Sequence, residues 1–248
     1  MLARERQQII IQKIMESGSV QCEVLAKELD VSLMTIRRDL EKLKQEGCIE
    51  RFHGGAVLKK ETPYMDKQVS NLSDKELIAR KAVEYIETGD TVFLDAGTTT
   101  YNIAKLIMDR TDLTIVTNDI EIAHLLKESP MEVIVCGGVI QSTTGSMLGM
   151  FANEVIRHIS INISFLGAAS IDNHFFVLTP TMQKSEFKSL VVRNSLLSYL
   201  VVDESKFNKR AMLKINHLKD YTGVITNKEF DEREQAGILR MNINVIPV

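Results

Sequence analysis

The first 46 residues contain three short stretches in which apolar side chains recur at the spacing of an α-helix. The first ends at Gly18, the second covers residues 24–29, and the third runs from Ser32 to about Glu46. The hydroxyl of Ser32 can cap the N-terminus of the third stretch, and Gly47 can end it. The pattern predicts three short helices that pack on one another.

The third predicted helix has two different faces. Ile36, Leu40 and Leu43 fall on one apolar stripe, which we expect to pack against the first two helices. The opposite face carries Met34 and several basic side chains. A helix of this kind is held in place by one face and leaves the other available for a partner.

Two short strands are expected after the third helix. Residues 49–52 favour the first strand, and the glycines of the turn at 53–56 favour the return of the chain as a hairpin. The polar segment 59–73 has few aliphatic residues and is expected to be a linker. It would separate a helical bundle with an appended hairpin, residues 1–58, from a larger domain, residues 74–248.

Beyond the linker, short runs rich in β-branched residues alternate with helical segments. This alternation is typical of a mostly parallel sheet that helices cover on both faces. We expect strands at 91–95, 113–117, 132–136, 163–167, 199–203, 223–226 and 244–246, and helices at 75–87, 100–108, 120–126 and 186–197. The predicted fold class of this part is α/β.

The charge of the chain limits how it can bind nucleic acid. Its 30 basic and 33 acidic side chains give a net charge of -3, which excludes a basic surface over the whole chain. Residues 1–60 hold 11 basic and 9 acidic side chains, and the remainder is acidic. Any contact with DNA must therefore be local.

Cysteine usage and hydropathy exclude other classes of protein. Cys22, Cys48 and Cys136 are widely spaced and form no CxxC pair, so we expect buried thiols rather than disulfides or a zinc site. No apolar run is long enough to span a membrane, and the first residues are too charged for a signal peptide. We expect a cytoplasmic protein that holds no metal and no cofactor.

A local DNA contact is predicted on the third helix and the hairpin. The helix presents Thr35, Arg37 and Arg38 while its other face is packed, which is the geometry that a major groove accepts. Arginine can bind guanine or phosphate, and Thr and Met can contact a thymine methyl group. The predicted DNA-binding residues are Ser32, Met34, Thr35, Arg37, Arg38, Lys42, Arg51, His53, Gly54 and Gly55.

The alternative is that these arginines form only a solvated face. Arg37 would then pair with Glu41, one helical turn later. The turn before the helix and the glycine-containing hairpin after it favour DNA binding. A lone His such as His53 is more often a surface or packing residue than a DNA contact.

Three predicted strand ends in the α/β part carry glycine or small polar residues. Asp95-Ala96-Gly97-Thr98-Thr99-Thr100 ends one strand and opens a helix, whose free backbone N–H groups favour an anion. Thr117 and Asn118 follow the second strand, and Gly137 and Gly138 follow the third. Such loops at the carboxyl edge of a parallel sheet are typical of a ligand crevice, although the first loop alone is also compatible with a plain strand-to-helix turn.

Two further segments bear on this predicted ligand site. Gly145 and Ser146 form either a lid that supplies backbone donors or an ordinary loop. Lys206 follows a strand and either reaches the ligand as a positive charge or stays in solvent. The predicted effector-binding residues are Asp95, Gly97, Thr98, Thr99, Thr100, Thr117, Asn118, Gly137, Gly138, Gly145 and Lys206.

Several segments of the N-terminal part form a specific series. They are Arg6-Gln7-Gln8-Ile9, Leu25-Ala26, Val31-Ser32, Thr35-Ile36-Arg37-Arg38-Asp39-Leu40, Gly47 and Arg51-Phe52-His53-Gly54-Gly55-Ala56. At this spacing the series resembles the DNA-binding half of the DeoR family of transcriptional regulators. The resemblance implies a winged helix-turn-helix, with the third helix in the major groove and the hairpin as the wing.

A second series lies in the α/β part. It comprises Asp95, Gly97, Thr98, Thr99, Thr117, Asn118, Gly137, Gly138, Gly145, Gly167-Ala168, Lys188, Asp203 and Ser205-Lys206. This series resembles the effector domain of the same family, which implies a fold similar to ribose-5-phosphate isomerase and a phosphorylated sugar or related metabolite as ligand. The chain has Ala169-Ser170 where Asp-Gly is usual, and Phe175-Phe176-Val177 in place of a glycine-containing stretch, so we expect a drier pocket.

Three classes of function follow from these observations. An isomerase would need a carboxylate base, for which only Asp172 and Glu186 stand close after the strand end at 167–170. A second alternative is a DNA-binding protein whose large domain only oligomerises. The favoured function is a non-enzymatic repressor of carbohydrate-metabolism genes, which binds double-stranded operator DNA as a homodimer or homotetramer and responds to a phosphorylated sugar. The repressing sign is implied by the resemblance alone.

Overall fold

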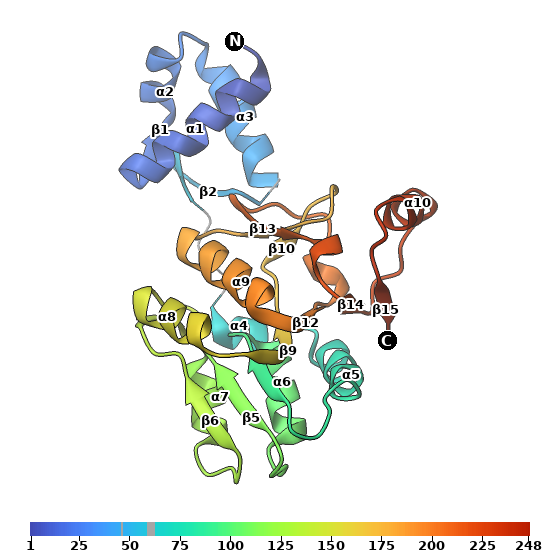
Figure 1. Ribbon diagram of the computed structural model, residues 1–248. Helices are drawn as coiled ribbons and strands as arrows, with labels where there is room; N and C mark the ends of the chain where they lie inside the picture. Colours follow the sequence, from blue (N-terminus) through green and yellow to red (C-terminus); the bar gives the residue numbers. More distant parts are fainter. Residues whose placement is uncertain (46, 59–62) are drawn as a thin grey trace. The chain divides into compact units, whose positions relative to one another are not determined.

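The chain forms two compact units in the computed structural model, which describes residues 1–45, 47–58 and 63–248 (Figure 1). The first unit comprises the described residues up to 58 together with Lys209–Met212. The second unit holds the other described residues. Each unit has an apolar core of its own.

Three helices and a three-stranded antiparallel sheet make up the first unit. In chain order its elements are α1 (Ala3–Ser17), β1 (Ser19–Gln21), α2 (Cys22–Glu28), α3 (Leu33–Gln45), β2 (Ile49–Phe52) and β3 (Gly55–Leu58). The strand order is β1-β3-β2, with β2 and β3 forming the predicted hairpin. Strand β1 is not evident from the sequence, because three residues with a single buried side chain show no measurable alternation.

The predicted apolar stripe of α3 is confirmed, because all three of its side chains are buried in the core of the first unit. The predicted cap is confirmed as well, since the Thr35 amide donates to Ser32 Oγ over 3.1 Å. Asp39 is a buried acid on α3, and it accepts hydrogen bonds from Arg6 Nε at 2.5 Å and Gln7 Nε2 at 3.1 Å. This buried ion pair fixes α1 against α3.

The second unit is built on a seven-stranded parallel sheet with the order β15-β14-β12-β9-β4-β5-β6. Its strands are β4 (Thr91–Leu94), β5 (Thr114–Thr117), β6 (Glu132–Val135), β9 (Ile161–Leu166), β12 (Ser195–Val201), β14 (Gly223–Thr226) and β15 (Val245–Pro247). All seven predicted strands are present, and six of them differ from the prediction by at most two residues at either end. The exception is β12, which begins four residues early, so residues 195–197 belong to this strand and not to the predicted helix 186–197. The predicted fold class is therefore confirmed.

Helices pack on both faces of this sheet. The helices α5 (Leu72–Val83), α6 (Thr98–Ile107) and α7 (Ile120–Leu126) share one apolar cluster, and α8 (Met150–His158) and α9 (Met182–Asn194) share the other. Strand β4 contributes to both layers, because Val92 and Leu94 lie in the first cluster and Phe93 lies in the second. Burial on both faces explains why the strands are continuous apolar runs in the sequence.

Smaller elements complete the second unit. They are α4 (Tyr64–Val69), the hairpin of β7 (Val139–Gln141) and β8 (Ser146–Leu148), the sheet of β10 (Ser170–Ile171), β11 (Phe176–Thr179) and β13 (Leu213–His217), the helix α10 (Glu232–Arg240) and two 3-10 turns, Glu204–Lys206 and Leu218–Asp220. Most of them are too short for periodicity to reveal them.

The segment expected to be a linker differs from the prediction. Residues 59–62 lie outside the described residues, but residues 64–69 form α4, and α5 already begins at Leu72. Pro63 stands directly before α4, where its fixed φ suits the entry into a helix. Because no side chain of α4 is buried, the helix needs no apolar stripe and its sequence resembles a linker.

Cys22 and Cys136 are buried thiols, as expected, and Cys48 is partly buried. Within the described residues, no group of His, Cys, Asp or Glu side chains is placed to hold a metal ion. In the same part of the chain, no helix combines the length and apolarity needed to cross a membrane.

Candidate functional site

Helix α3 presents one polar face of the first unit to solvent. The exposed side chains opposite its buried stripe are Met34, Arg37, Arg38 and Lys42. Among the described residues, no acidic side chain pairs with Arg37 or Arg38. Glu41, the alternative partner of Arg37, instead accepts a hydrogen bond from Arg51 Nη1 at 3.1 Å. The arginines of α3 are therefore available to phosphate and base edges.

The hairpin contributes fewer of the predicted DNA-binding residues. His53 and Gly54 form its exposed tip, and the φ of +88° at Gly54 lies in the region that favours glycine. Gly55 is buried, and a Cβ there would lie 2.2 Å from Val20 O and 2.6 Å from Phe52 Cζ. Gly55 is needed for the approach of β1 to β3, so its predicted contact with DNA is corrected to a packing role.

Arg51 is also held within the first unit. Arg51 is partly buried and its guanidinium group is bound to Glu41. In the structure it is therefore not free to contact DNA, contrary to the prediction from the sequence. Ser32 and Thr35 stand at the start of α3, with their hydroxyl oxygens 2.9 Å apart. Met34, Arg38 and Lys42 thus lie opposite the buried stripe of α3, with Thr35 and Arg37 on either side of them and Ser32 just before the helix, whereas His53 and Gly54 lie on a separate turn.

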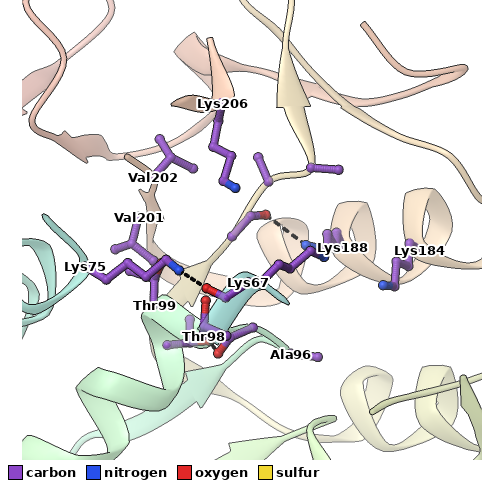
Figure 2. Close-up of a pocket in the computed structure, with 15 residues that line it drawn as sticks. Lys67, Lys75, Ala96, Thr98, Thr99, Lys184, Lys188, Val201, Val202 and Lys206 are labelled. Carbon is purple, nitrogen blue, oxygen red and sulfur yellow. Dashed lines mark hydrogen bonds between the residues drawn. The ribbon is translucent and has the colours of Figure 1, made fainter. Parts of the chain in front are cut away.

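A cavity of about 60 Å³ lies in the second unit, at the carboxyl ends of β4, β9 and β12 (Figure 2). Strand β4 pairs with β5 on one side and β9 on the other, so the chain reverses direction across the sheet here. Open parallel sheets bind ligands at such switch points. The lining residues are Lys67, Lys75, Ala96, Gly97, Thr98, Thr99, Thr100, Gly167, Ala168, Ala169, Lys184, Lys188, Val201, Val202 and Lys206, and we call this hollow the lysine cavity.

Helix α6 begins at the wall of the lysine cavity. No side chain caps its N-terminus, so the first N–H groups and the positive end of the helix dipole are available to an anion. The preceding amides are not available. Ala96 N donates to Asn118 Oδ1 at 3.0 Å, and Gly97 N donates to Asp119 Oδ2 at 2.9 Å. A ligand would therefore be held by the first turn of α6 and not by the loop before it.

Lys188 and Asp95 form a buried ion pair beside the cavity. Lys188 Nζ lies 2.6 Å from Asp95 Oδ2 and donates to Gly167 O at 2.8 Å. The Gly167 amide donates to the same carboxylate oxygen at 2.9 Å. The pair joins the ends of β4 and β9 and holds one ammonium group at the cavity wall.

Lys75 is the most deeply buried lysine of the cavity, with 2% of its surface exposed. Its Nζ donates to Lys67 O (Figure 2). It also donates to Ser70 O over 2.6 Å. Burial lowers the pKa of Lys75, and the nearby Lys206 lowers it further. Because a buried ammonium group is costly, an anion in this cavity would offset that cost.

Five of the predicted effector residues line the lysine cavity: Gly97, Thr98, Thr99, Thr100 and Lys206. The hydroxyl of Thr100 is engaged with the backbone, because its Oγ1 donates to Asp95 O at 2.6 Å and Gly97 O at 2.8 Å. Lys206 Nζ lies 3.8 Å from Asp203 Oδ2. Asp95 does not line the cavity itself but is bound to Lys188, which does.

The other five predicted effector residues do not line this cavity: Thr117, Asn118, Gly137, Gly138 and Gly145. Two of them have a visible part in the fold. Thr117 Oγ1 donates to Leu94 O at 2.7 Å, and a Cβ at Gly138 would lie 2.4 Å from Leu148 O. Gly145 has a φ of +72° in the turn between β7 and β8. Polar or glycine residues at a strand end do not distinguish a tight turn from a ligand loop.

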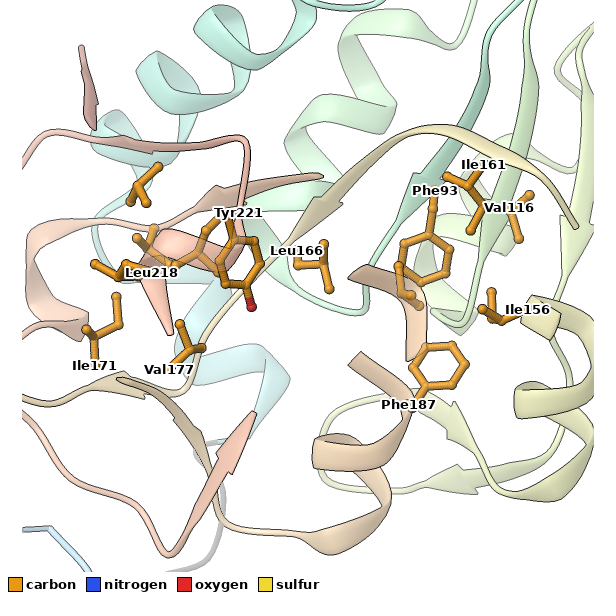
Figure 3. Packing of buried hydrophobic residues seen from close by; sticks show 14 of the residues in the cluster. Phe93, Val116, Ile156, Ile161, Leu166, Ile171, Val177, Phe187, Leu218 and Tyr221 are labelled. Carbon is orange, nitrogen blue, oxygen red and sulfur yellow. The ribbon is translucent and has the colours of Figure 1, made fainter. Parts of the chain in front are cut away.

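The predicted set omits four of the cavity's lysines as ligand residues: Lys67, Lys75, Lys184 and Lys188. Lys184 and Lys188 lie one turn apart on α9, on either side of Phe187, which packs against Phe93 in the core (Figure 3). These lysines occupy positions on the buried side of the helix, where apolar residues are usual. That departure from the usual pattern is the sequence signal by which they could have been recognised.

The expected effect of the extra phenylalanines is wrong. Phe175 is buried in the core, and Phe176 lies against His217 with a ring distance of 5.0 Å and beneath Lys214 Nζ at 3.5 Å. Neither phenylalanine lines the lysine cavity, whereas Ala169 does. The wall of the lysine cavity therefore carries positive charge, and no aromatic ring among the described residues makes it apolar.

The two candidate catalytic carboxylates also lie away from the cavity lining. Asp172 Oδ1 accepts hydrogen bonds from His174 N and Phe176 N, both at 2.9 Å, and so closes a turn. Glu186 is exposed on α9. The arrangement places neither carboxylate where a bound ligand would meet it.

Asp119 is a buried acid that shapes the loop before α6. Its carboxylate accepts hydrogen bonds from the amides of Gly97, Glu121 and Ile122 at 2.9, 2.7 and 3.3 Å. Burial raises the pKa of Asp119 to about 6, against the three amide donors, which favour the charged form. The loop that positions α6 thus depends on an acid that titrates in a mild pH range.

Known proteins match both units of the chain. Residues 6–62 match the DeoR-like helix-turn-helix domain, and residues 70–228 match the DeoR C terminal sensor domain. The chain is 35% identical over 253 residues to an uncharacterized HTH-type transcriptional regulator of Haemophilus influenzae, covering 100% of this chain and 98% of that protein. It is 33% identical over 227 residues to the glycerol-3-phosphate regulon repressor of Escherichia coli, covering 90% of each.

Solved structures that match part of the chain include ribose 5-phosphate isomerase A from Methanocaldococcus jannaschii. The TM-score is 0.42 at 17% identity, over 56% of this chain and 55% of that chain. The two domain matches and the full-length relatives confirm the resemblance found in the sequence. The chain belongs to the DeoR family and is a DNA-binding transcriptional regulator.

Proposed function

We propose that this regulator represses genes of carbohydrate metabolism and that a phosphorylated metabolite in the lysine cavity controls its affinity for operator DNA. The observation that carries the proposal is that five lysines and the uncapped N-terminal turn of α6 line the same cavity. A phosphoryl group can accept from those N–H groups and compensate the buried ammonium charge. The name of the Escherichia coli relative, a regulon repressor, supports the repressing sign.

Operator contacts are assigned to the exposed face of α3 and the tip of the hairpin. Arg37 and Arg38 would contact base edges and phosphates in the major groove, and Lys42 would contact the backbone. His53 and Gly54 would form the wing. Since one short helix makes few contacts, we infer that two or more copies of the chain bind paired half-sites, as a homodimer or homotetramer.

We infer that the second unit senses its ligand and does not convert it. An isomerase needs a carboxylate base at the reacting carbon, but Asp95 is bound to Lys188 and Asp172 closes a turn. Incubation of the protein with pentose and hexose phosphates, followed by NMR, is expected to show no interconversion. Turnover that disappears in Asp172→Ala would contradict this inference.

The ligand assignment is tested by thermal unfolding of the full chain with phosphorylated sugars and with the same sugars lacking phosphate. Only the phosphorylated compounds should raise Tm, because the unphosphorylated ones bring no charge to the cavity. Lys206→Met should weaken the response at least tenfold in ligand concentration. Lys219→Met, which removes an exposed lysine outside the cavity lining, is the matched control.

A flat Tm across all phosphorylated sugars, with DNA binding intact, would contradict the sensor role. It would favour the alternative in which the large unit only assembles copies of the chain.

A further inference from the structure

The turn between α4 and α5, residues 67–71, is held by a lysine of the cavity. Lys75 Nζ donates to the carbonyl oxygens of Lys67 and Ser70, at the C-terminal end of α4. Lys75 lies on the first turn of α5 and is buried together with Ile78 and Ala79 of the same helix. A charged side chain in this position links the wall of the cavity directly to the backbone of the turn.

A second connection reaches the same turn from the opposite wall. Asn71 Nδ2 donates to Asp203 Oδ1 at 3.0 Å, and Lys206 Nζ lies 3.8 Å from the other oxygen of this carboxylate. Asp203 is fully buried. Burial opposes the charged form of Asp203, but hydrogen bonds and the charge of Lys206 outweigh it, so its pKa is lowered. Two lysines of the cavity, Lys75 and Lys206, are thus each connected to the α4–α5 turn.

Helix α4 is the first helix of the second unit. None of its side chains is buried, and its first amide, Tyr64 N, donates to Thr143 O at 3.0 Å. Along the chain, α4 is the first described element after the DNA-binding unit. The α4–α5 turn therefore lies close in sequence to one of the segments that covalently join the two units.

We propose that Lys75 binds the phosphoryl group of the ligand and, through the carbonyls of Lys67 and Ser70, makes the α4–α5 turn the element that responds to occupancy of the cavity. An ammonium group has three N–H donors, and the two carbonyls take two of them. The third is left for an anion in the cavity that Lys75 lines. This inference rests on the proposed function, since it requires the anion to bind there.

The expected direction follows from the charge of Lys75. An anion stabilises the charged form of the buried amine, and that form is the one that donates to both carbonyls. The ligand-bound protein therefore holds the turn more firmly than the free protein. A ligand can shift the turn only through such a difference in contacts between the two states.

The test is amide hydrogen exchange of the full-length protein with and without saturating inorganic phosphate. In the wild type, phosphate should slow exchange at least fivefold both at residues 98–100 and at residues 67–71. In Lys75→Met, phosphate at a higher saturating concentration should still slow exchange at 98–100 but leave 67–71 unchanged. Lys75→Arg, which keeps the charge and the donors, should restore the response of the turn.

Lys81→Met is the matched control, because Lys81 lies on the same helix, is partly exposed, pairs with Glu84 and does not line the cavity. It should respond as the wild type does. The Lys75 ammonium resonance, followed by NMR in the wild type, should also shift with phosphate, so the test does not depend on the folding of a variant.

The outcomes separate the two proposals. If phosphate leaves residues 98–100 unprotected in the wild type, the ligand site itself is wrong. Protection at 98–100 with an unchanged turn, an unshifted Lys75 resonance, or a full response of the turn in Lys75→Met would overturn the role of Lys75 alone.

Discussion

Arg37 and Arg38 stand in solvent on α3, whereas Lys75 and Lys188 are buried around a cavity in the second unit. The solvated arginines keep their freedom to adapt to a polyanion, whose binding is driven by release of counter-ions. The buried lysines are oriented by carbonyls and a carboxylate before any ligand arrives, so less ordering remains for binding to supply. The difference teaches that one chain uses exposed charge for a large partner and enclosed charge for a small one.

The largest effect on stability is expected from breaking the buried Arg6–Asp39 ion pair, which holds α3 against α1. Asp39→Ala leaves Arg6 buried without its partner and should lower the stability of the first unit by about 3–5 kcal/mol. Denaturant unfolding of the full chain measures this change. DNA binding should be lost, and stabilisation by a phosphorylated ligand should persist.

Lys13→Ala is the control for this experiment, because it removes a solvent-exposed pair with Glu28 and should cost less than about 1 kcal/mol. An Asp39→Ala protein as stable as Lys13→Ala would show that the buried pair does not hold α3 in place.

The enclosed charge of the second unit should appear in the pH dependence of its stability. The pKa of Asp119 is raised in the folded state to about 6 from 3.8, so the folded protein holds this proton more firmly than the unfolded chain. The proton on Asp119 therefore adds about 3 kcal/mol to the free energy of unfolding below about pH 4. This stabilisation is lost as the pH rises through 6.

Asp119→Asn removes this titration. The stability of the wild type relative to the variant should fall between pH 4 and pH 7, as measured by denaturant unfolding at each pH. A constant difference over that interval would mean that the acid keeps its ordinary pKa despite burial.

Arg38→Ala tests the exposed face directly. Loss of one arginine from the groove should weaken specific binding by about 1–3 kcal/mol, or roughly tenfold to a hundredfold. Fluorescence anisotropy with a duplex selected from a random-sequence pool measures it. Arg51→Ala, whose arginine is bound to Glu41, should weaken binding far less. Equal affinities of the wild type and Arg38→Ala would contradict the placement of α3 in the major groove.

The smallest effect is expected at Lys42, which is assigned to the DNA backbone. Lys42→Ala should weaken binding by less than about tenfold and lower the slope of log affinity against log salt by about 0.9. Its effect should be equal on selected and unrelated duplexes. A slope identical to that of the wild type would contradict the backbone contact.

Local pattern was sufficient for the first unit because its site lies on one helix. The stripe of Ile36, Leu40 and Leu43 defines a buried face, and the opposite face then follows from helix geometry. The roles of Arg51 and Gly55 could not be predicted in this way. They depend on Glu41 and Val20, which only the folded sheet brings near.

In the second unit the strands were predictable, but the position of the cavity was not. Consecutive strand ends at β4, β5 and β6 suggested one crevice, yet the cavity lies where β4 meets β9, a pairing that no local pattern contains. The buried lysines did leave a signal. Lys75 precedes Ile78, Ala79 and Ala82 on one helical stripe, so it stands at a position that normally holds an apolar side chain.

The central claim is that occupancy of the lysine cavity changes the affinity of α3 for DNA, and Gly97→Val tests it most directly. The backbone of Gly97 is extended and a Cβ there meets Thr100 Oγ1 only at 3.6 Å, so the added side chain obstructs the cavity rather than the fold. The measurement is the affinity for the selected duplex, with and without the phosphorylated sugar that most raises Tm. The wild type should lose at least tenfold in affinity on adding the sugar, and Gly97→Val should bind the duplex normally and not respond. An undiminished response in Gly97→Val, or none in the wild type, would contradict the account.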